Sequence, residues 1–198
     1  MSETVDRCVR ANISVTLDGR FHGPGGPKDL SPIVPYMTTD VARDQLSRVH
    51  QGVTTALLGR GSAEGFLGWW SGVADDPDAD ERDRGYAQWL VGVDKVVFSS
   101  TLTEAPWGRT RIANRPAAEV VAQLKSEGSG DILANTSPSI IKPLLARNLV
   151  DRLYLMVTPE IAGAGDRLFH DGLRPSAWTL VSAETGELGE MALVYDRA

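Results

Sequence analysis

The stretch Asp131-Ile-Leu-Ala-Asn-Thr-Ser-Pro-Ser-Ile140 is the most informative segment of this chain. Its first residues are apolar enough for a buried strand, and three small polar residues, Asn135, Thr136 and Ser137, separate that strand from a predicted helix. A strand that ends in this way directs backbone N–H groups and the positive end of a helix dipole toward one point. The sequence therefore predicts an anion-binding turn, with phosphate as its natural ligand.

Two further junctions repeat this pattern. Val96-Val-Phe-Ser-Ser-Thr101 also runs from apolar into small polar residues, and Ala56-Leu-Leu-Gly-Arg-Gly-Ser62 adds a guanidinium group. The carboxyl ends of parallel strands meet at one edge of a sheet, where ligands of such folds bind. Three junctions of this kind predict a ligand with several phosphates, and a dinucleotide cofactor fits.

Composition narrows the class of protein. The 198 residues are 42% hydrophobic and 23% charged, as in soluble globular domains. The net charge of −6 argues against a nucleic-acid-binding surface, which is normally basic. We expect a small-molecule substrate and no nucleic-acid partner.

Cysteine and histidine are too sparse for a metal site. Cys8 is the single cysteine, and the three histidines lack zinc-ligand spacing, so no metal is expected. No apolar run approaches the roughly 20 residues of a membrane span, and the first residues lack the apolar core of a signal peptide. The sequence predicts a cytoplasmic protein without membrane contact.

Hydrophobic periodicity predicts one α/β domain over residues 1–198. Strands are expected at 9–17, 53–58, 94–99, 110–113, 131–134, 151–157, 178–183 and 191–195. Helices are expected from about 40 to 50, from Ser62 through Trp70, at 84–91, at 116–126 and from 137–139 to 147. The acidic stretch 75–83 is expected to be a solvated loop. This order predicts a mostly parallel sheet flanked by helices, with a C-terminal antiparallel hairpin.

Several stretches together resemble a known family. They are Val15–Gly19, Leu57–Phe66 with Trp70, Val97–Leu102, Gly130–Leu133, Leu149–Val157, and Pro159, Gly163, Gly165 and Arg167–Phe169. In this order they resemble the dihydrofolate-reductase-like superfamily. They are most similar to the reductase domain of riboflavin biosynthesis, the C-terminal half of the bifunctional deaminase–reductase. No His-x-Glu with Pro-Cys-x-x-Cys occurs in the chain, so a stand-alone reductase is expected.

The resemblance implies a reductase that uses NADPH. The positions that match cofactor-binding residues of the family are Ser14, Gly19, Gly59, Arg60, Ser62, Ser99, Ser100, Thr101, Asn135, Thr136, Ser137, Gly163, Ala164 and Gly165. Ser62 replaces the usual threonine, and Thr136 stands where the family often has glycine. The Thr136 side chain could crowd a pyrophosphate, or its hydroxyl could bind one.

Two residues are predicted on the substrate side. Asp18 matches the loop where substrate and cofactor meet, and it is the candidate catalytic residue, although Asp-Gly is also a common turn. Trp70 is the candidate substrate-contacting residue, with ordinary helix packing as the alternative. Arg20, Lys28 and Arg43 are candidates for a substrate phosphate without an assigned pocket.

The resemblance leaves three functions open. The first is NADPH-dependent reduction of a ribosylamino-pyrimidine, as in 5-amino-6-(5-phosphoribosylamino)uracil reductase. The second is dihydrofolate or pterin reduction, for which no convincing Trp-x-Leu-Pro segment is present. The third is a non-catalytic nucleotide-binding protein, an alternative that Thr136 keeps open. Relatives commonly form dimers, so a homodimer is expected.

Overall fold

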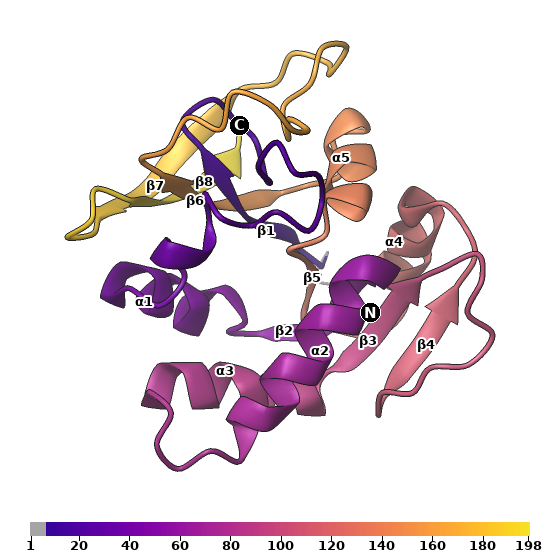
Figure 1. Ribbon diagram of the computed structural model, residues 1–198. Helices are drawn as coiled ribbons and strands as arrows, with labels where there is room; N and C mark the ends of the chain where they lie inside the picture. Colours follow the sequence, from indigo (N-terminus) through magenta and orange to yellow (C-terminus); the bar gives the residue numbers. More distant parts are fainter. Residues whose placement is uncertain (1–6) are drawn as a thin grey trace.

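The structure is a computed structural model that describes residues 7–198. The strands are β1 (Val9–Thr16), β2 (Val53–Gly59), β3 (Asp94–Phe98), β4 (Thr110–Ala113), β5 (Asp131–Asn135), β6 (Arg152–Thr158), β7 (Trp178–Thr185) and β8 (Met191–Arg197). Within these residues they form one sheet in the order β4-β3-β2-β5-β1-β6-β8-β7 (Figure 1). Strands β1 to β6 pair in parallel, and β8 runs antiparallel to β6 and β7. The predicted fold class, with its C-terminal antiparallel hairpin, is confirmed.

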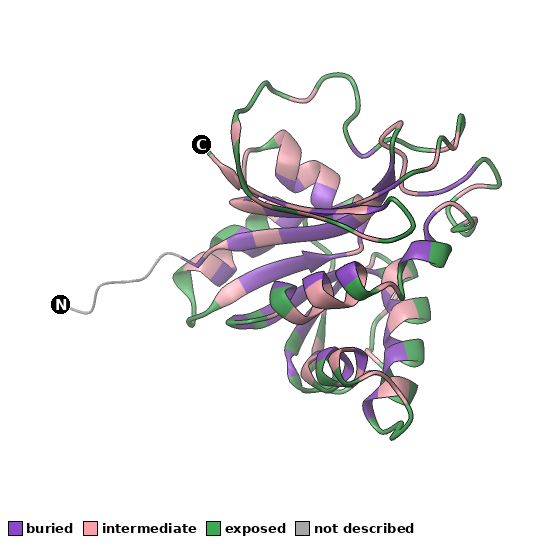
Figure 2. Cartoon of the chain, turned by 90° about the vertical axis from the view of Figure 1, so that its left-hand side faces the viewer, coloured by how far each residue is buried: buried purple, intermediate pink, exposed green. Residues whose placement is uncertain are grey.

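Helices cover both faces of the sheet. They are η1 (Val34–Tyr36), α1 (Asp40–Val49), α2 (Arg60–Ala74), α3 (Glu81–Gly92), α4 (Ala117–Ser126) and α5 (Pro138–Ala146). Helices α2 and α3 pack on one face, and α4 and α5 pack on the other. Figure 2 shows the buried residues concentrated on the strands and on the helix sides that face them. No helix in the described part of the chain is both long and apolar enough to cross a bilayer.

Two helices begin earlier than predicted. Helix α2 starts at Arg60 with Gly59 as its N-cap, so Ser62 lies in the first turn and does not cap the helix. Helix α3 starts at Glu81, and the Asp80 carboxylate caps it by accepting a backbone N–H of the first turn at 2.9 Å. Part of the stretch predicted as an acidic loop is therefore helical, because carboxylates are favoured at a helix N-terminus.

Helix α5 contains a proline in its interior. It runs over Pro138–Ala146 with Ser137 as N-cap, within the predicted limits, and Pro143 lies one turn after Ser139. Proline has no backbone N–H, so Pro143 cannot donate to the carbonyl four residues earlier. That carbonyl belongs to Ser139.

The carboxyl ends of the parallel strands lie along one edge of the sheet. Strands β1, β2, β3, β5 and β6 end there at Thr16, Gly59, Phe98, Asn135 and Thr158. All three junctions predicted to bind phosphate follow strands that end at this edge. Binding sites of open α/β sheets lie outside such carboxyl ends.

Candidate functional site

The turn after β5 is held by its neighbours on both sides. Thr136 adopts a left-handed backbone conformation, with φ +43°. Its N–H donates to the carbonyl of Asn12 at 2.8 Å, and its carbonyl accepts the Ser62 hydroxyl at 2.9 Å. The predicted anion turn is thereby tied to β1 and to the first turn of α2.

Ser137 joins this turn to the end of β2. Its buried hydroxyl accepts the Gly59 N–H at 3.0 Å and donates to the Asn135 carbonyl at 2.8 Å. A Cβ on Gly59 would stand 2.6 Å from the Ser139 hydroxyl oxygen, so glycine allows β2 to approach α5 closely. The N–H groups of Ser137 and Ser139 have no acceptor among the described residues, and such free groups at a helix start bind anions.

A buried network of side-chain amide groups also holds the turn after β5. The Asn12 side-chain amide donates to the Asn135 side-chain oxygen at 3.0 Å, and the Asn135 amide donates to the Tyr86 hydroxyl. Asn135 and Tyr86 are fully buried, and burial raises the pKa of Tyr86, so the phenol stays neutral. Because buried amides need partners, this network favours a single conformation of the turn.

Arg60 joins the junction after β2 to the junction after β3. The Arg60 guanidinium donates to the hydroxyl of Thr101 and to the carboxylate of Glu64. The Ser99 hydroxyl accepts the N–H groups of Thr101 and Leu102 at 3.2 and 3.0 Å, which closes the turn after β3. The three junctions therefore lie side by side, as the parallel strands predicted.

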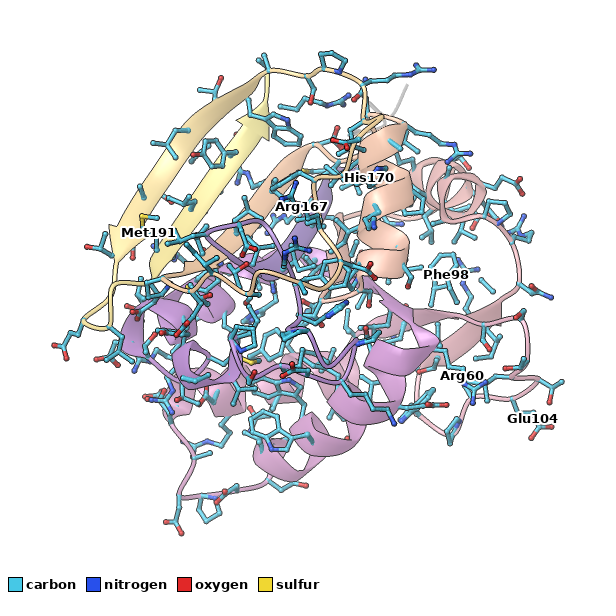
Figure 3. All side chains as sticks on the ribbon, turned by 45° about the horizontal axis from the view of Figure 1, so that its top comes forward. Arg60, Phe98, Glu104, Arg167, His170 and Met191 are labelled. Carbon is cyan, nitrogen blue, oxygen red and sulfur yellow. The ribbon has the colours of Figure 1, made fainter. Side chains whose placement is uncertain are left out.

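An open cavity of about 490 Å³ extends from this junction. It lies between the ends of β3 and β4 and the starts of α4 and α5. In Figure 3 the labelled Phe98, the last residue of β3, lies beside α5. Its lining residues are Phe98, Ser99, Ser100, Ala113, Asn114, Arg115, Pro116, Ala117, Ser139, Ile140, Pro143 and Arg147. The lining has two arginines, three serine hydroxyls and no carboxylate. Helix starts, hydroxyls and guanidinium groups all favour an anion.

Sequence reasoning missed the two arginines of this lining. Arg115 and Arg147 come from separate segments and belong to no recognised motif. One signal was available, because Arg115 immediately precedes the proline at the start of a predicted helix. A cation there lies beside any anion bound at the helix start.

The Asp18 carboxylate accepts hydrogen bonds from four neighbouring groups, and its catalytic role stays a prediction. Its carboxylate accepts the Thr16 hydroxyl at 2.6 Å and the Arg20 guanidinium at 2.8 Å. It also accepts the N–H groups of Ala162 and Gly163, both at 3.0 Å. The hydrogen bond from Thr16, with those from Arg20 and the backbone, holds the pKa of Asp18 far below its usual value.

Asp18 and its neighbours bind the glycine-rich loop after β6. The Arg20 guanidinium donates to the Gly165 carbonyl. Gly165 has φ +108°, and a Cβ there would stand 2.5 Å from the carbonyl oxygen of His22. The buried His22 ring accepts the N–H of Asp166 at 3.2 Å. The predicted cofactor loop 163–165 is thus held against the loop that follows β1.

The remaining predicted cofactor residues lie near these loops. Gly19 has φ +74° in the turn after β1, and Ser14 lies within β1 opposite Met156 of β6. Ala164 is exposed. Within the described residues no hydrogen bond joins loop 163–165 to the turn after β5. Their roles stay predictions.

Trp70 packs inside the molecule, which corrects the prediction that it contacts substrate. It is 5% exposed, and its ring lies edge-on against Tyr86 at 4.7 Å between ring centroids. The helix-packing alternative is the one observed, whereas the neighbouring Trp69 is 58% exposed.

Arg43, a sequence candidate for binding a substrate phosphate, forms an ion pair instead. Its guanidinium group pairs with Asp83 at 2.9 Å.

No metal-binding cluster is present in residues 7–198, in which no three histidine, cysteine or acidic side chains are arranged to hold an ion. The three polar junctions at this edge supply N–H groups, hydroxyls and the Arg60 guanidinium group. Such donors complement a multiply charged anion.

The chain shares a family model and a fold with known proteins. Residues 7–190 match the family model described as the RibD C-terminal domain. No curated protein matches the chain in sequence.

Solved structures share the fold. A protein assigned to riboflavin biosynthesis in Shewanella sp. PV-4 has TM-score 0.68 and 18% identity, over 96% of this chain and 99% of that one. The Thermotoga maritima diaminohydroxyphosphoribosylaminopyrimidine deaminase/5-amino-6-(5-phosphoribosylamino)uracil reductase has TM-score 0.67 and 14% identity, over 98% of this chain and 57% of that one. The Enterococcus faecalis dihydrofolate reductase complexed with NADP(H) and RAB-propyl has TM-score 0.58 and 18% identity, over 96% of each chain. The chain therefore has the dihydrofolate-reductase-like fold.

Proposed function

Because the chain belongs to the RibD C-terminal domain family, we propose that it is an NADPH-dependent reductase of a ribosylamino-pyrimidine or a related small heterocycle. The deaminase/reductase with the same fold carries a 5-amino-6-(5-phosphoribosylamino)uracil reductase activity in its name, and the dihydrofolate reductase was solved with NADP(H). The proposal transfers this class of chemistry to the site described above.

The cavity beside α5 is the observation that carries the proposal. Arg115 and Arg147 line it together with the hydroxyls of Ser99 and Ser100, and no acidic residue lines it. An acidic residue at the ribose would select NAD, whereas guanidinium groups and hydroxyls complement a 2′-phosphate. This cavity is where we place the adenosine end of NADPH.

The turn after β5 would hold the pyrophosphate. Ser137 and Ser139 offer N–H groups at the start of α5, and Gly59 leaves room for a close approach. Arg60 lies at the neighbouring junction, and its side chain is 47% exposed. These residues fit the cofactor because donors and a cation surround the place where its charge would lie.

The protein contributes binding and orientation to the proposed reaction. When bound, NADPH supplies the hydride, and the fold determines which face of its ring meets the substrate. Asp18 orders the two loops beside the ends of β1 and β6 by accepting N–H groups from Ala162 and Gly163. Arg20 and Arg43 are committed to ion pairs, so Lys28 is the remaining sequence candidate for a substrate phosphate.

The pterin alternative is disfavoured by the first long helix. Pterin reductases need an acidic residue to bind the substrate, and the acidic residues of α1 are Asp40 and Asp44. Both pair with Arg82 at the surface, at 2.6 and 2.7 Å. Neither of them lines the cavity beside α5.

Cofactor binding tests the proposal directly. Thermal unfolding measured with NADPH and with NADH should show a larger shift with NADPH, because a ligand that binds the native state stabilises it, by about 2.7 kcal/mol at a hundredfold excess over Kd. Arg147→Gln should weaken NADPH binding about tenfold or more and leave NADH binding nearly unchanged. Arg111→Gln, an exposed arginine outside the cavity lining, is the matched control. No thermal shift with either cofactor would refute the proposal.

Catalysis separates the reductase from a non-catalytic binder. NADPH oxidation followed by absorbance, with ribosylamino-pyrimidine and dihydropterin substrates supplied in turn, should show turnover with the pyrimidine. NADPH binding without oxidation of any of these compounds would favour the binder. The homodimer stays a prediction, and sedimentation of the purified chain would test it.

A further inference from the structure

Thr136 is an unusual residue for its backbone position. Its φ of +43° lies in the left-handed region, where glycine and asparagine are common and β-branched residues are rare. Neighbouring groups hold this conformation, because the N–H and the carbonyl of Thr136 are both hydrogen-bonded. Strained residues that persist in this way concentrate at functional sites.

The Thr136 hydroxyl has no partner in the structure. Its Oγ1 atom is buried and makes no hydrogen bond. A buried hydroxyl without a partner destabilises the folded protein. Both the backbone and the side chain of Thr136 therefore lower the stability of the unliganded protein.

Two backbone donors at the start of α5 are already taken or missing, which leaves the N–H groups of Ser137 and Ser139. The Thr136 N–H is already bonded to Asn12, and Pro138 has no N–H. The Ser137 hydroxyl is engaged with Gly59 and Asn135. Within residues 135–137, all of which are described, Thr136 thus has the one side-chain donor without a partner.

We propose that Thr136 is a cofactor-binding residue whose hydroxyl donates to a pyrophosphate oxygen. This inference rests on the proposed function and adds a specific atom to it. Rotation about the Cα–Cβ bond directs the hydroxyl to a bound anion without moving the backbone. The Thr136 hydroxyl then donates the hydrogen bond that the Thr136 N–H cannot, because that N–H is bonded to Asn12. The bound anion in turn gives the hydroxyl an acceptor.

Two substitutions and two ligands test the role of the hydroxyl. Thr136→Val keeps the branched shape and removes the hydroxyl, whereas Thr136→Ser keeps the hydroxyl. Affinities would be measured by calorimetry for 2′-phospho-ADP-ribose, which contains the pyrophosphate, and for adenosine 2′-monophosphate, which lacks it. Thr136→Val should bind 2′-phospho-ADP-ribose about tenfold more weakly and adenosine 2′-monophosphate as the wild type does. Thr136→Ser should keep both affinities within about threefold.

Thermal unfolding without ligand gives an independent readout. Thr136→Val should unfold at a higher temperature than the wild type, because it removes the unpaired buried hydroxyl. Unchanged 2′-phospho-ADP-ribose affinity in Thr136→Val would overturn the inference, and so would an equal loss for both ligands, which indicates a general distortion. If the wild-type protein binds neither ligand nor NADPH, the proposed function itself fails.

Discussion

Glycine is frequent in two regions of this molecule for opposite reasons. In the loop after β6, Gly163 and Gly165 have positive φ values of +70° and +108°, and Gly165 packs against the carbonyl of His22. In α2 the glycines are helical, and a Cβ on any of them would meet nothing within 4 Å: Gly61, Gly65, Gly68 and Gly72. The loop after β6 requires glycine, because only glycine suits its backbone conformation and its close packing. Helix α2 is instead destabilised by its glycines, which make no close contact in return.

The strongest test of this comparison is Gly165→Ala. The new Cβ would stand 2.5 Å from a backbone oxygen, at a backbone conformation that alanine rarely adopts. We expect a loss of about 3 kcal/mol or more in the free energy of unfolding, measured by urea denaturation. Gly163→Ala is the matched control, because its φ is also positive but its Cβ meets nothing within 4 Å, and it should cost only about 1 kcal/mol. Equal losses would show that contact with His22 is unimportant.

The second test removes the carboxylate that holds the loop. Asp18→Asn should lose about 1–2 kcal/mol of unfolding free energy at pH 7, because an amide cannot accept all four hydrogen bonds. The pKa of Asp18 is lowered in the folded state, so its contribution is present above the unfolded pKa of about 3.9 and is lost as pH falls through the folded pKa. The difference between wild type and variant should therefore shrink at acidic pH. A difference that stays constant from pH 7 to pH 2 would contradict this account.

The smallest expected effects are in α2. Gly68→Ala and Gly72→Ala should each raise the unfolding free energy by about 0.5–1 kcal/mol, because alanine favours the helix and nothing obstructs its methyl group. Chemical denaturation of the single and double variants would measure this gain, which should be additive within about 0.5 kcal/mol. A loss of stability in either variant would show that this face of α2 contacts something in solution.

Sequence reasoning predicted the fold from local patterns. Short runs rich in apolar and β-branched residues marked each strand of the described sheet, and the parallel direction of most strands followed from their alternation with helices. The meeting of the three polar junctions could also be predicted, because the carboxyl ends of parallel strands share one edge. The starts of α2 and α3 were misplaced because Gly59 and Asp80 serve as caps where serine and a loop were expected.

The roles of individual side chains depended on tertiary contacts that no local pattern contains. No local pattern shows that the Asp18 carboxylate accepts the N–H groups of Ala162 and Gly163, far along the chain. Trp70 was expected to face a ligand, and only the position of α3 shows that Tyr86 covers its ring. Arg147 belongs to no motif and becomes informative only through the cavity that it lines.

The proline within α5 has a consequence for one wall of the cavity. Pro143 leaves the Ser139 carbonyl without its usual helical donor, and both residues line the cavity. That wall is therefore a helical turn with one backbone hydrogen bond fewer than a regular helix.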